Sequence, residues 1–179
     1  MLAQRLQQVA DILQAKDFQQ ALDALTEIES SGAESADFWQ LLALAHKGLG
    51  ELKDAEDSFL KSVQLLPQPH VLTNLANFYR QQRRHEEAET RYQQALELDS
   101  SHLPARVNYG QLLLEVKQLT ASAQQFAAAL EQEPEHLNAQ IGLAQASQQL
   151  GDQENALALF QQVLSIDNNN AAALNGLGI

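Results

Sequence analysis

The sequence predicts an all-α protein, and three observations support this prediction. Ala, Leu, Gln and Glu, which are good helix formers, dominate the 179 residues. Aromatic residues, which favour strands together with β-branched residues, make up only 6% of the chain. One helical pattern returns five times along the chain, at a spacing of 33 or 34 residues. The apolar content of 45% is normal for a folded globular protein.

The repeat is clearest as a small residue followed, four positions later, by a bulky one. Residues four apart share one face of a helix, so the small residue allows two helices to cross closely and the bulky one fills the space beside the crossing. The small residues are Ala21, Ala55, Ala88, Ser122 and Ala156, and the bulky ones are Leu25, Phe59, Tyr92, Phe126 and Phe160. A large-small pair lies upstream of most of them, at Leu42-Ala43, Leu75-Ala76, Tyr109-Gly110 and Leu143-Ala144.

Taken in chain order, each unit is expected to form two helices. The first unit begins with an amphipathic stretch, has Gln8-Val9 in place of the large-small pair, and offers Asp17 as the N-cap of its second helix. Pro67 ends the second unit, the third contains the amphipathic stretch HEEAETRYQQALELD, and Pro134 ends the fourth. Asp152 is the expected N-cap in the fifth. The expected units are 2–35, 36–68, 69–102, 103–136 and 137–170, with a sixth starting at 171–179.

This pattern resembles the tetratricopeptide repeat family, and the resemblance covers nearly the whole chain. The copy that matches the family best consists of Trp39, Leu42, Ala43, Ala55, Phe59 and Pro67. A helix pair cannot bury both of its faces alone, so such units stack on one another. The resemblance therefore implies one array over residues 1–179, a right-handed superhelical solenoid of antiparallel helix pairs whose first helices line a concave face.

The charge of the chain narrows the classes of partner. A net charge of −12 and a pI near 4.7 argue against nucleic acid, because Lys and Arg supply most of the affinity for phosphates. They also argue against an anionic membrane surface, and no apolar run is long enough to span a bilayer. The chain has no Cys, and its N-terminus does not resemble a secretory signal. A cytoplasmic location is the default expectation.

The sequence gives no indication of an enzyme, a cofactor or a metal. It lacks a Gly-rich phosphate loop, an H-E-x-x-H motif and a G-x-S-x-G motif. His70, His102 and His136 recur near the junctions between units, but helix layers are about 10 Å apart, whereas metal–ligand bonds are about 2 Å long. His46 falls in a helix-packing position. No metal site is expected.

The register of the first helices predicts a peptide-binding concave face that is rich in amides. Asn and Gln side chains both donate and accept hydrogen bonds, which suits the backbone of an extended peptide. The predicted binding residues are Gln40, Lys47, Thr73, Asn74, Asn77, Arg80, Gln81, Asn108, Gln111, Asn138 and Gln145, with Leu44, Glu115 and Gln148 beside them. Eight of the 11 basic residues lie between Lys47 and Arg106. Lys47 and Arg80 are expected to point into the groove and to favour an acidic peptide or a free carboxylate.

One subset of the family clamps the C-terminal carboxylate of heat-shock chaperones with Lys, Asn, Asn, Lys and Arg from three successive first helices. In this sequence Asn77 and Asn108 match the two amides. Thr73, Asn138 and Gly142 occupy the three cationic positions, so the clamp is not supported.

The sequence thus predicts a non-catalytic scaffold that binds a protein or peptide segment. One alternative is that the array recruits substrates for a larger enzyme, because the family's arrays are joined to glycosyltransferases, sulfotransferases and oxygenases. Another is self-assembly into a homo-oligomer through residues 171–179, where Leu174 and Leu177 would present an apolar helix face.

Overall fold

The computed structural model describes residues 2–179, and these residues form eleven α-helices. The helices are α1 (Leu2–Gln14), α2 (Phe18–Gly32), α3 (Ala36–Leu49), α4 (Leu52–Leu65), α5 (Pro69–Gln81), α6 (His85–Leu98), α7 (Leu103–Glu115), α8 (Leu119–Gln132), α9 (Leu137–Leu150), α10 (Gln153–Ile166) and α11 (Ala171–Leu177). The prediction of an all-α fold is confirmed. None of these helices combines the length and the apolar character needed to cross a bilayer.

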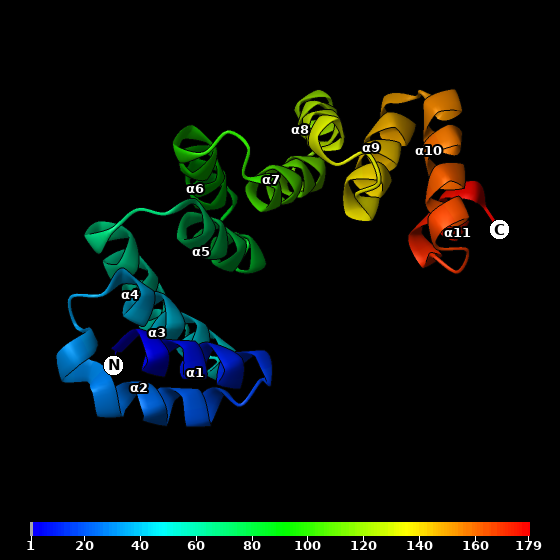
Figure 1. The fold of residues 1–179 in the computed structure, drawn as a ribbon. Coiled ribbons are helices and arrows are strands. Elements are labelled where there is room, and N and C mark those ends of the chain that lie inside the picture. Colours follow the sequence, from blue (N-terminus) through cyan, green and yellow to red (C-terminus); the bar gives the residue numbers. More distant parts are fainter. Residues whose placement is uncertain (1) are drawn as a thin grey trace.

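Consecutive helices pack as pairs, and the pairs stack in line. Each odd-numbered helix from α1 to α9 contacts the even-numbered helix that follows it, and each pair contacts the next pair along the chain. Figure 1 shows the resulting arc, with the two chain ends at its opposite ends and with α3, α5, α7 and α9 nearer its hollow side than α4, α6, α8 and α10. We call the hollow side the inner face.

Capping side chains start several of the helices. Asp17 accepts a hydrogen bond from the backbone N–H of Gln20 at 3.1 Å, and Asp152 does the same for Asn155 at 3.2 Å. Both predicted N-caps are therefore confirmed. Ser35 caps α3 in the same way. These caps satisfy backbone donors that have no partner inside the helix.

The turn inside each of the five complete pairs contains one residue with a left-handed backbone. Gly50 and Gly151 adopt φ values of 81° and 89°, which cost a glycine little. Three basic residues hold the corresponding places in the other turns: Lys16, Arg83 and Lys117, with φ between 60° and 64°. The backbone geometry is thus repeated even where the glycine is not.

The core follows the repeated small and bulky positions. Ala21, Ala55 and Ala88 are completely buried, and Phe59, Tyr92 and Phe126 are also at 0% exposure. Ser122 fits the small position because its hydroxyl donates to the carbonyl of Gly110 at 2.8 Å. The first pair is packed as well, although its large-small pair is Gln8-Val9, since Val9 is only 2% exposed.

Polar side chains connect the second pair of helices to the third. The Arg84 guanidinium donates to both carboxylate oxygens of Glu56, at 2.6 and 2.8 Å, and also hydrogen bonds to Glu87. It lies over the Tyr79 ring, 4.3 Å from the centroid. The Tyr79 hydroxyl donates to Glu56 at 3.1 Å. These contacts hold α5 and α6 against α4 and help to fix the spacing of the inner face.

Candidate binding surface

Four of the amide side chains that the sequence predicts for the inner face have unused hydrogen-bonding groups within residues 2–179. Asn74 on α5, Asn108 and Gln111 on α7, and Gln145 on α9 are half-buried. Within residues 2–179, no hydrogen bond joins their side chains to another group. A half-buried amide without a partner has lost part of its hydration. A hydrogen bond from a peptide backbone to this amide therefore stabilises the complex.

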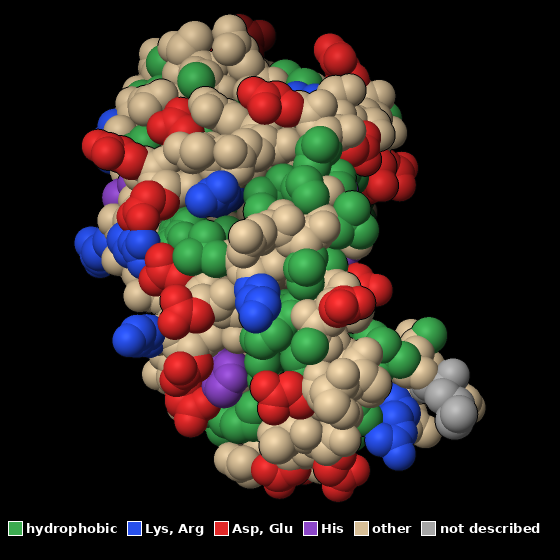
Figure 2. Space-filling view, turned by 90° about the vertical axis from the view of Figure 1, so that its left-hand side faces the viewer, with side chains coloured by type: hydrophobic (Ala, Val, Ile, Leu, Met, Phe, Trp, Pro, Cys, Tyr) green, Lys and Arg blue, Asp and Glu red, His purple; other side chains and the backbone are tan. Residues whose placement is uncertain are grey.

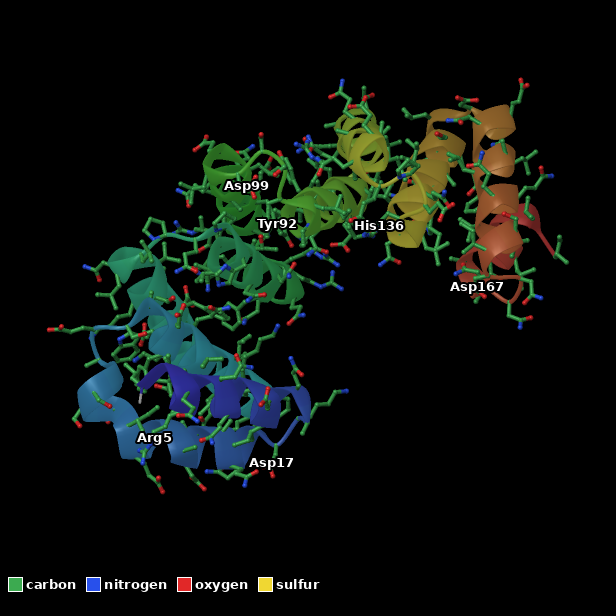
Figure 3. All side chains as sticks on the ribbon, viewed as in Figure 1. Arg5, Asp17, Tyr92, Asp99, His136 and Asp167 are labelled. Atoms are coloured by element: carbon green, nitrogen blue, oxygen red, sulfur yellow. The ribbon has the colours of Figure 1, made fainter. Side chains whose placement is uncertain are left out.

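Two other predicted amides already have partners. The Tyr92 hydroxyl donates to Asn77 Oδ1 at 2.5 Å. Tyr92 points into the interior between α5, α6 and α7 (Figure 3), and burial raises its pKa to about 12. Gln40 Oε1 lies 3.0 Å from Nε2 of His70 and so links α3 to α5. Asn77 and Gln40 therefore help to hold the stack together.

Thr73 does not offer the accessible polar group that the sequence predicts. It is only 4% exposed, and its hydroxyl donates to the carbonyl of Pro69 at 2.7 Å, one turn earlier in α5. A threonine in a helix often turns its hydroxyl back to its own backbone in this way. Gln81 and Asn138 are exposed, at the end of α5 and the start of α9.

The two predicted cations of the inner face differ in their surroundings. Nε of Arg80 lies 3.4 Å from a carboxylate oxygen of Glu115 on α7, so much of its charge is already compensated. Lys47 is half-buried near the end of α3, and no acidic side chain in the described part of the chain pairs with it. Burial lowers the pKa of the Lys47 ammonium. Lys47 is therefore the cation that remains available to a ligand.

Lys47 borders an apolar hollow that the sequence analysis missed. The hollow has a volume of about 440 Å³ and lies between α1, the start of α2 and α3. Its lining consists of Ala10, Leu13, Gln14, Phe18, Leu41, Leu44, Lys47 and Gly48. A Cβ on Gly48 would lie 2.2 Å from the Phe18 ring, so the glycine is what allows this ring to lie against α3. In the sequence, the feature that could have indicated this hollow is the glycine next to Lys47, Gly48.

A second hollow continues the first along α1 and α3. Its volume is about 380 Å³, and it shares Ala10 and Leu41 with the first. Leu2, Ala3, Leu6, Gln7, Ser35, Asp37 and Gln40 complete its lining. We call the two hollows together the α1–α3 trough. It has Lys47 at one end and Asp37, an exposed carboxylate in the first turn of α3, at the other.

Three potential metal ligands lie together where α3 turns into α4. The left-handed Gly50 brings Glu51 back to His46, with 2.6 Å between Nδ1 and Oε2. Asp54 completes a group whose ligand atoms lie within 4.8 Å of one another. The sequence predicts His46 only as a helix-packing residue, because the approach of Glu51 and Asp54 depends on the folded turn. His46 and Glu51 already satisfy each other by their hydrogen bond, and we assign no metal to them.

The side of the molecule opposite the inner face carries exposed apolar side chains. Figure 2 shows hydrophobic groups gathered through the middle of this face, with charged residues around them. The exposed large residues of α4, α6 and the segment after α4 are Leu52, Leu60, Leu65, Leu66 and Leu98. A hollow of about 350 Å³ lies there, lined by Val63, Pro67, Leu72, Arg91, Gln94, Glu97 and Leu98. We call it the α4–α6 hollow.

Comparison with known proteins decides the family. A family model described as a tetratricopeptide repeat matches residues 11–68 and 110–173, and a second model with the same description matches residues 71–103. The chain belongs to the tetratricopeptide repeat family. The prediction from the repeated residues is confirmed, and the stacked pairs form a tetratricopeptide superhelix.

Among curated proteins, this tetratricopeptide array is similar to part of a much longer protein. It is 30% identical over 134 residues to Protein RRP5 homolog of Homo sapiens, and 29% identical to its Mus musculus counterpart. The aligned residues cover 74% of the array but only about 7% of either relative.

Solved structures show the same fold at low identity. YrrB, described as a TPR protein with an unusual peptide-binding site, superposes with a TM-score of 0.79 at 19% identity, over 98% of the array and 91% of YrrB. PilW, described as a widely conserved type IV pilus biogenesis factor, gives a TM-score of 0.84 at 18% identity, over 97% and 84%. The MamA structure gives 0.78 at 16% identity, over 91% and 96%.

Proposed function

We propose that the array is a non-catalytic scaffold that holds an extended protein segment along its inner face. The observation that carries this proposal is the row of unbonded amides formed by Asn74, Asn108, Gln111 and Gln145. They come from three successive first helices, α5, α7 and α9, so their free groups follow the curve of the array.

The spacing of this row suits an extended chain. Neighbouring packed helices lie about 8–10 Å apart, and an extended chain advances about 3.3 Å per residue. Each unit therefore meets about three residues of the peptide. A peptide in this position bonds to one or two amides per unit through its own backbone, which gives affinity with little dependence on its sequence.

We expect the bound segment to contribute a single carboxylate rather than many acidic residues. Arg80 is paired with Glu115, and the chain carries a net charge of −12, which repels a strongly acidic peptide. Of the two predicted cations, Lys47 is the one without an acidic partner within residues 2–179. The peptide-binding site described for YrrB supports a peptide ligand by analogy of fold.

A random-peptide library displayed on phage tests this proposal. Peptides selected on the array are expected to lose at least tenfold in affinity on an Asn108→Ala, Gln111→Ala variant, because each lost hydrogen bond contributes about 1 kcal/mol. The matched control replaces exposed amides of second helices, Gln124→Ala and Gln161→Ala, and should bind normally. Equal binding by both variants, or a selection that yields no peptide, would contradict the proposal.

The other predictions about function and location stay open to direct tests. Recruitment of substrates for a larger enzyme is decided by the reading frame beyond residue 179. Self-assembly through residues 171–179 is decided by light scattering, since a strict monomer at high concentration excludes it. Imaging of a fluorescent fusion in the native cell tests the cytoplasmic location.

A further inference from the structure

We infer that the α1–α3 trough binds the C-terminal end of a peptide, with an apolar last side chain in the hollow beside Lys47, the α-carboxylate on Lys47, and a basic side chain about four residues upstream on Asp37. This inference rests on the proposed function and names the chemistry of the partner. It places the end of the bound segment on the first two helix pairs.

The carboxylate position follows from Lys47. Its ammonium is half-buried against apolar side chains and has no anionic partner in residues 2–179. Partial burial has cost the charge some of its hydration, and this shows as a lowered pKa. A carboxylate that binds to the ammonium compensates for the lost water contacts with a charge-assisted hydrogen bond, which is about twice as strong as a neutral one.

The apolar last residue follows from the hollow next to Lys47. Leu13, Phe18, Leu41 and Leu44 form its walls, and its volume of about 440 Å³ falls within the range of small-ligand pockets. Covering exposed apolar surface in a concave site stabilises the complex by about 25 cal/mol per Å². A leucine or phenylalanine side chain provides such a cover.

A chain end fits this place better than an internal acidic residue. The hollow is lined by residues near the ends of α1 and α3 and by Phe18, which follows the α1–α2 turn. The Phe18 ring lies close to Gly48, where a Cβ would lie only 2.2 Å from it. A C-terminal leucine offers an apolar side chain to the hollow and a carboxylate to Lys47 at the same time, whereas an internal glutamate offers Lys47 its carboxylate and leaves the hollow without an apolar side chain.

The upstream basic residue follows from Asp37 and sets the direction of the peptide. Asp37 precedes Lys47 by ten residues of one helix, which is about 15 Å along its axis. An extended chain covers that distance in about four or five residues. The carboxylate of Asp37 is exposed and makes no ion pair in the described residues. A peptide with an anionic end and a cation upstream therefore matches the trough in only one direction.

Fluorescence anisotropy with synthetic peptides tests the inference. The probe is a labelled heptapeptide, Gly-Ser-Arg-Ser-Gly-Ser-Leu, with a free C-terminus. Four altered peptides carry a C-terminal amide, Ser in place of Leu, Glu in place of Arg, or two added glycines that make the leucine internal. Each change is expected to weaken binding at least fivefold.

Protein variants assign each effect to a residue. Lys47→Met keeps the aliphatic stem and should weaken the acid roughly tenfold, the effect of one lost charge-assisted bond, while the amide is unaffected. Asp37→Asn should weaken binding of the Arg peptide and should not weaken binding of the Glu peptide. Lys53→Met on α4 removes an exposed lysine and serves as the matched control. Circular dichroism checks that each variant is folded.

The outcomes separate this inference from the proposed function. Equal affinity for acid and amide, or an equal loss for both on Lys47→Met, overturns the inference. If library peptides bind through Asn108 and Gln111 but the heptapeptide does not bind, the inference fails and the proposed function stands. If the library selection also fails, both are contradicted.

Discussion

Arg84 shows how one side chain can join two units of the array. From the N-cap position of α6 it bonds to Glu56 on α4, bonds to Glu87 in the first turn of α6, and covers the Tyr79 ring. The Arg84 guanidinium and the Tyr79 hydroxyl hold the pKa of Glu56 below its usual range, against the opposing effect of burial. The pKa of Tyr79 is raised by burial and by the nearby Glu56 carboxylate.

This arrangement predicts a stability difference that depends on pH. Because the folded protein lowers the pKa of Glu56, its contribution is fully present above the unfolded value of about 4.3 and is lost as pH falls through the lower folded value. A Glu56→Gln variant should be less stable than the natural chain by about 1 kcal/mol at pH 7, and the difference should shrink as pH falls through the lowered pKa of Glu56 in the folded protein.

Urea unfolding at several pH values measures this difference. Lys53→Gln, which changes an exposed and unpaired residue of the same helix, is the control. A gap between Glu56→Gln and the natural chain that stayed constant from pH 7 to pH 3 would show that the Glu56 charge does not act as described.

Single residues of the candidate site were harder to predict than the fold. Register alone placed Thr73 on the inner face, but its hydroxyl is used by the carbonyl of Pro69 and its side chain is buried. Register also placed Arg80 there, but its pairing with Glu115 of α7 depends on how α5 packs on α7. Whether Lys47 has a partner is likewise a property of the packed structure.

At the scale of the element, the turns inside the helix pairs repeat a left-handed residue that the sequence does not reveal. Glycine marks two of the five turns, whereas Lys16, Arg83 and Lys117 hold the same geometry in the other three. A side chain with a Cβ pays about 1–2 kcal/mol for this conformation. The packing of each helix pair requires this backbone conformation, and the three turns without glycine are less stable for it.

Replacing Arg83 with glycine should therefore stabilise the array. The gain from relieving the left-handed backbone exceeds the added flexibility of the unfolded chain, for a net increase of about 0.5–1 kcal/mol in the free energy of unfolding. Thermal or urea unfolding measures it. Arg83→Ala removes the same charge but keeps the Cβ, so it should give no such gain; equal gains by both variants would attribute the effect to charge.

The close crossing of α7, α8 and α9 depends on glycine for a different reason. A Cβ on Gly142 would lie 2.3 Å from the Phe126 ring, which is completely buried. Gly142→Ala should destabilise the protein by about 1 kcal/mol, because overpacking costs more than the gain in helix propensity. Adding Phe126→Leu should recover part of the loss. Gln148→Ala, on the same helix and exposed, is the control; a stabilised Gly142→Ala variant would contradict the packing shown here.

At the scale of the whole molecule, the architecture was predictable because the same helix-pair pattern recurs several times in the sequence. The small and bulky positions from Ala21 to Phe160 share one spacing, and each pair needs the next to cover its apolar face. A degenerate copy, such as the first with Gln8-Val9, is then supported by the others. The α1–α3 trough was not predictable in this way, because it occurs once and requires Phe18 and Gly48 to meet in space.

We expect the two faces of the curved array to have different roles. The binding surface proposed for the inner face contains unbonded amides and Lys47, which has no acidic partner within residues 2–179, whereas the α4–α6 hollow on the other side contains apolar residues such as Leu98. A partner that binds through the amides must contact first helices from several units. A partner that binds at Leu98 needs only α4 to α6.

A heteronuclear NMR titration of the array with a library-selected peptide distinguishes these faces most directly. We expect the amide signals that shift to belong to residues of α1, α3, α5, α7 and α9 on the inner face, including Asn108 and Gln111. Shifts confined to the α4–α6 hollow, around Val63, Arg91 and Leu98, would contradict the claim that the inner face is the binding surface.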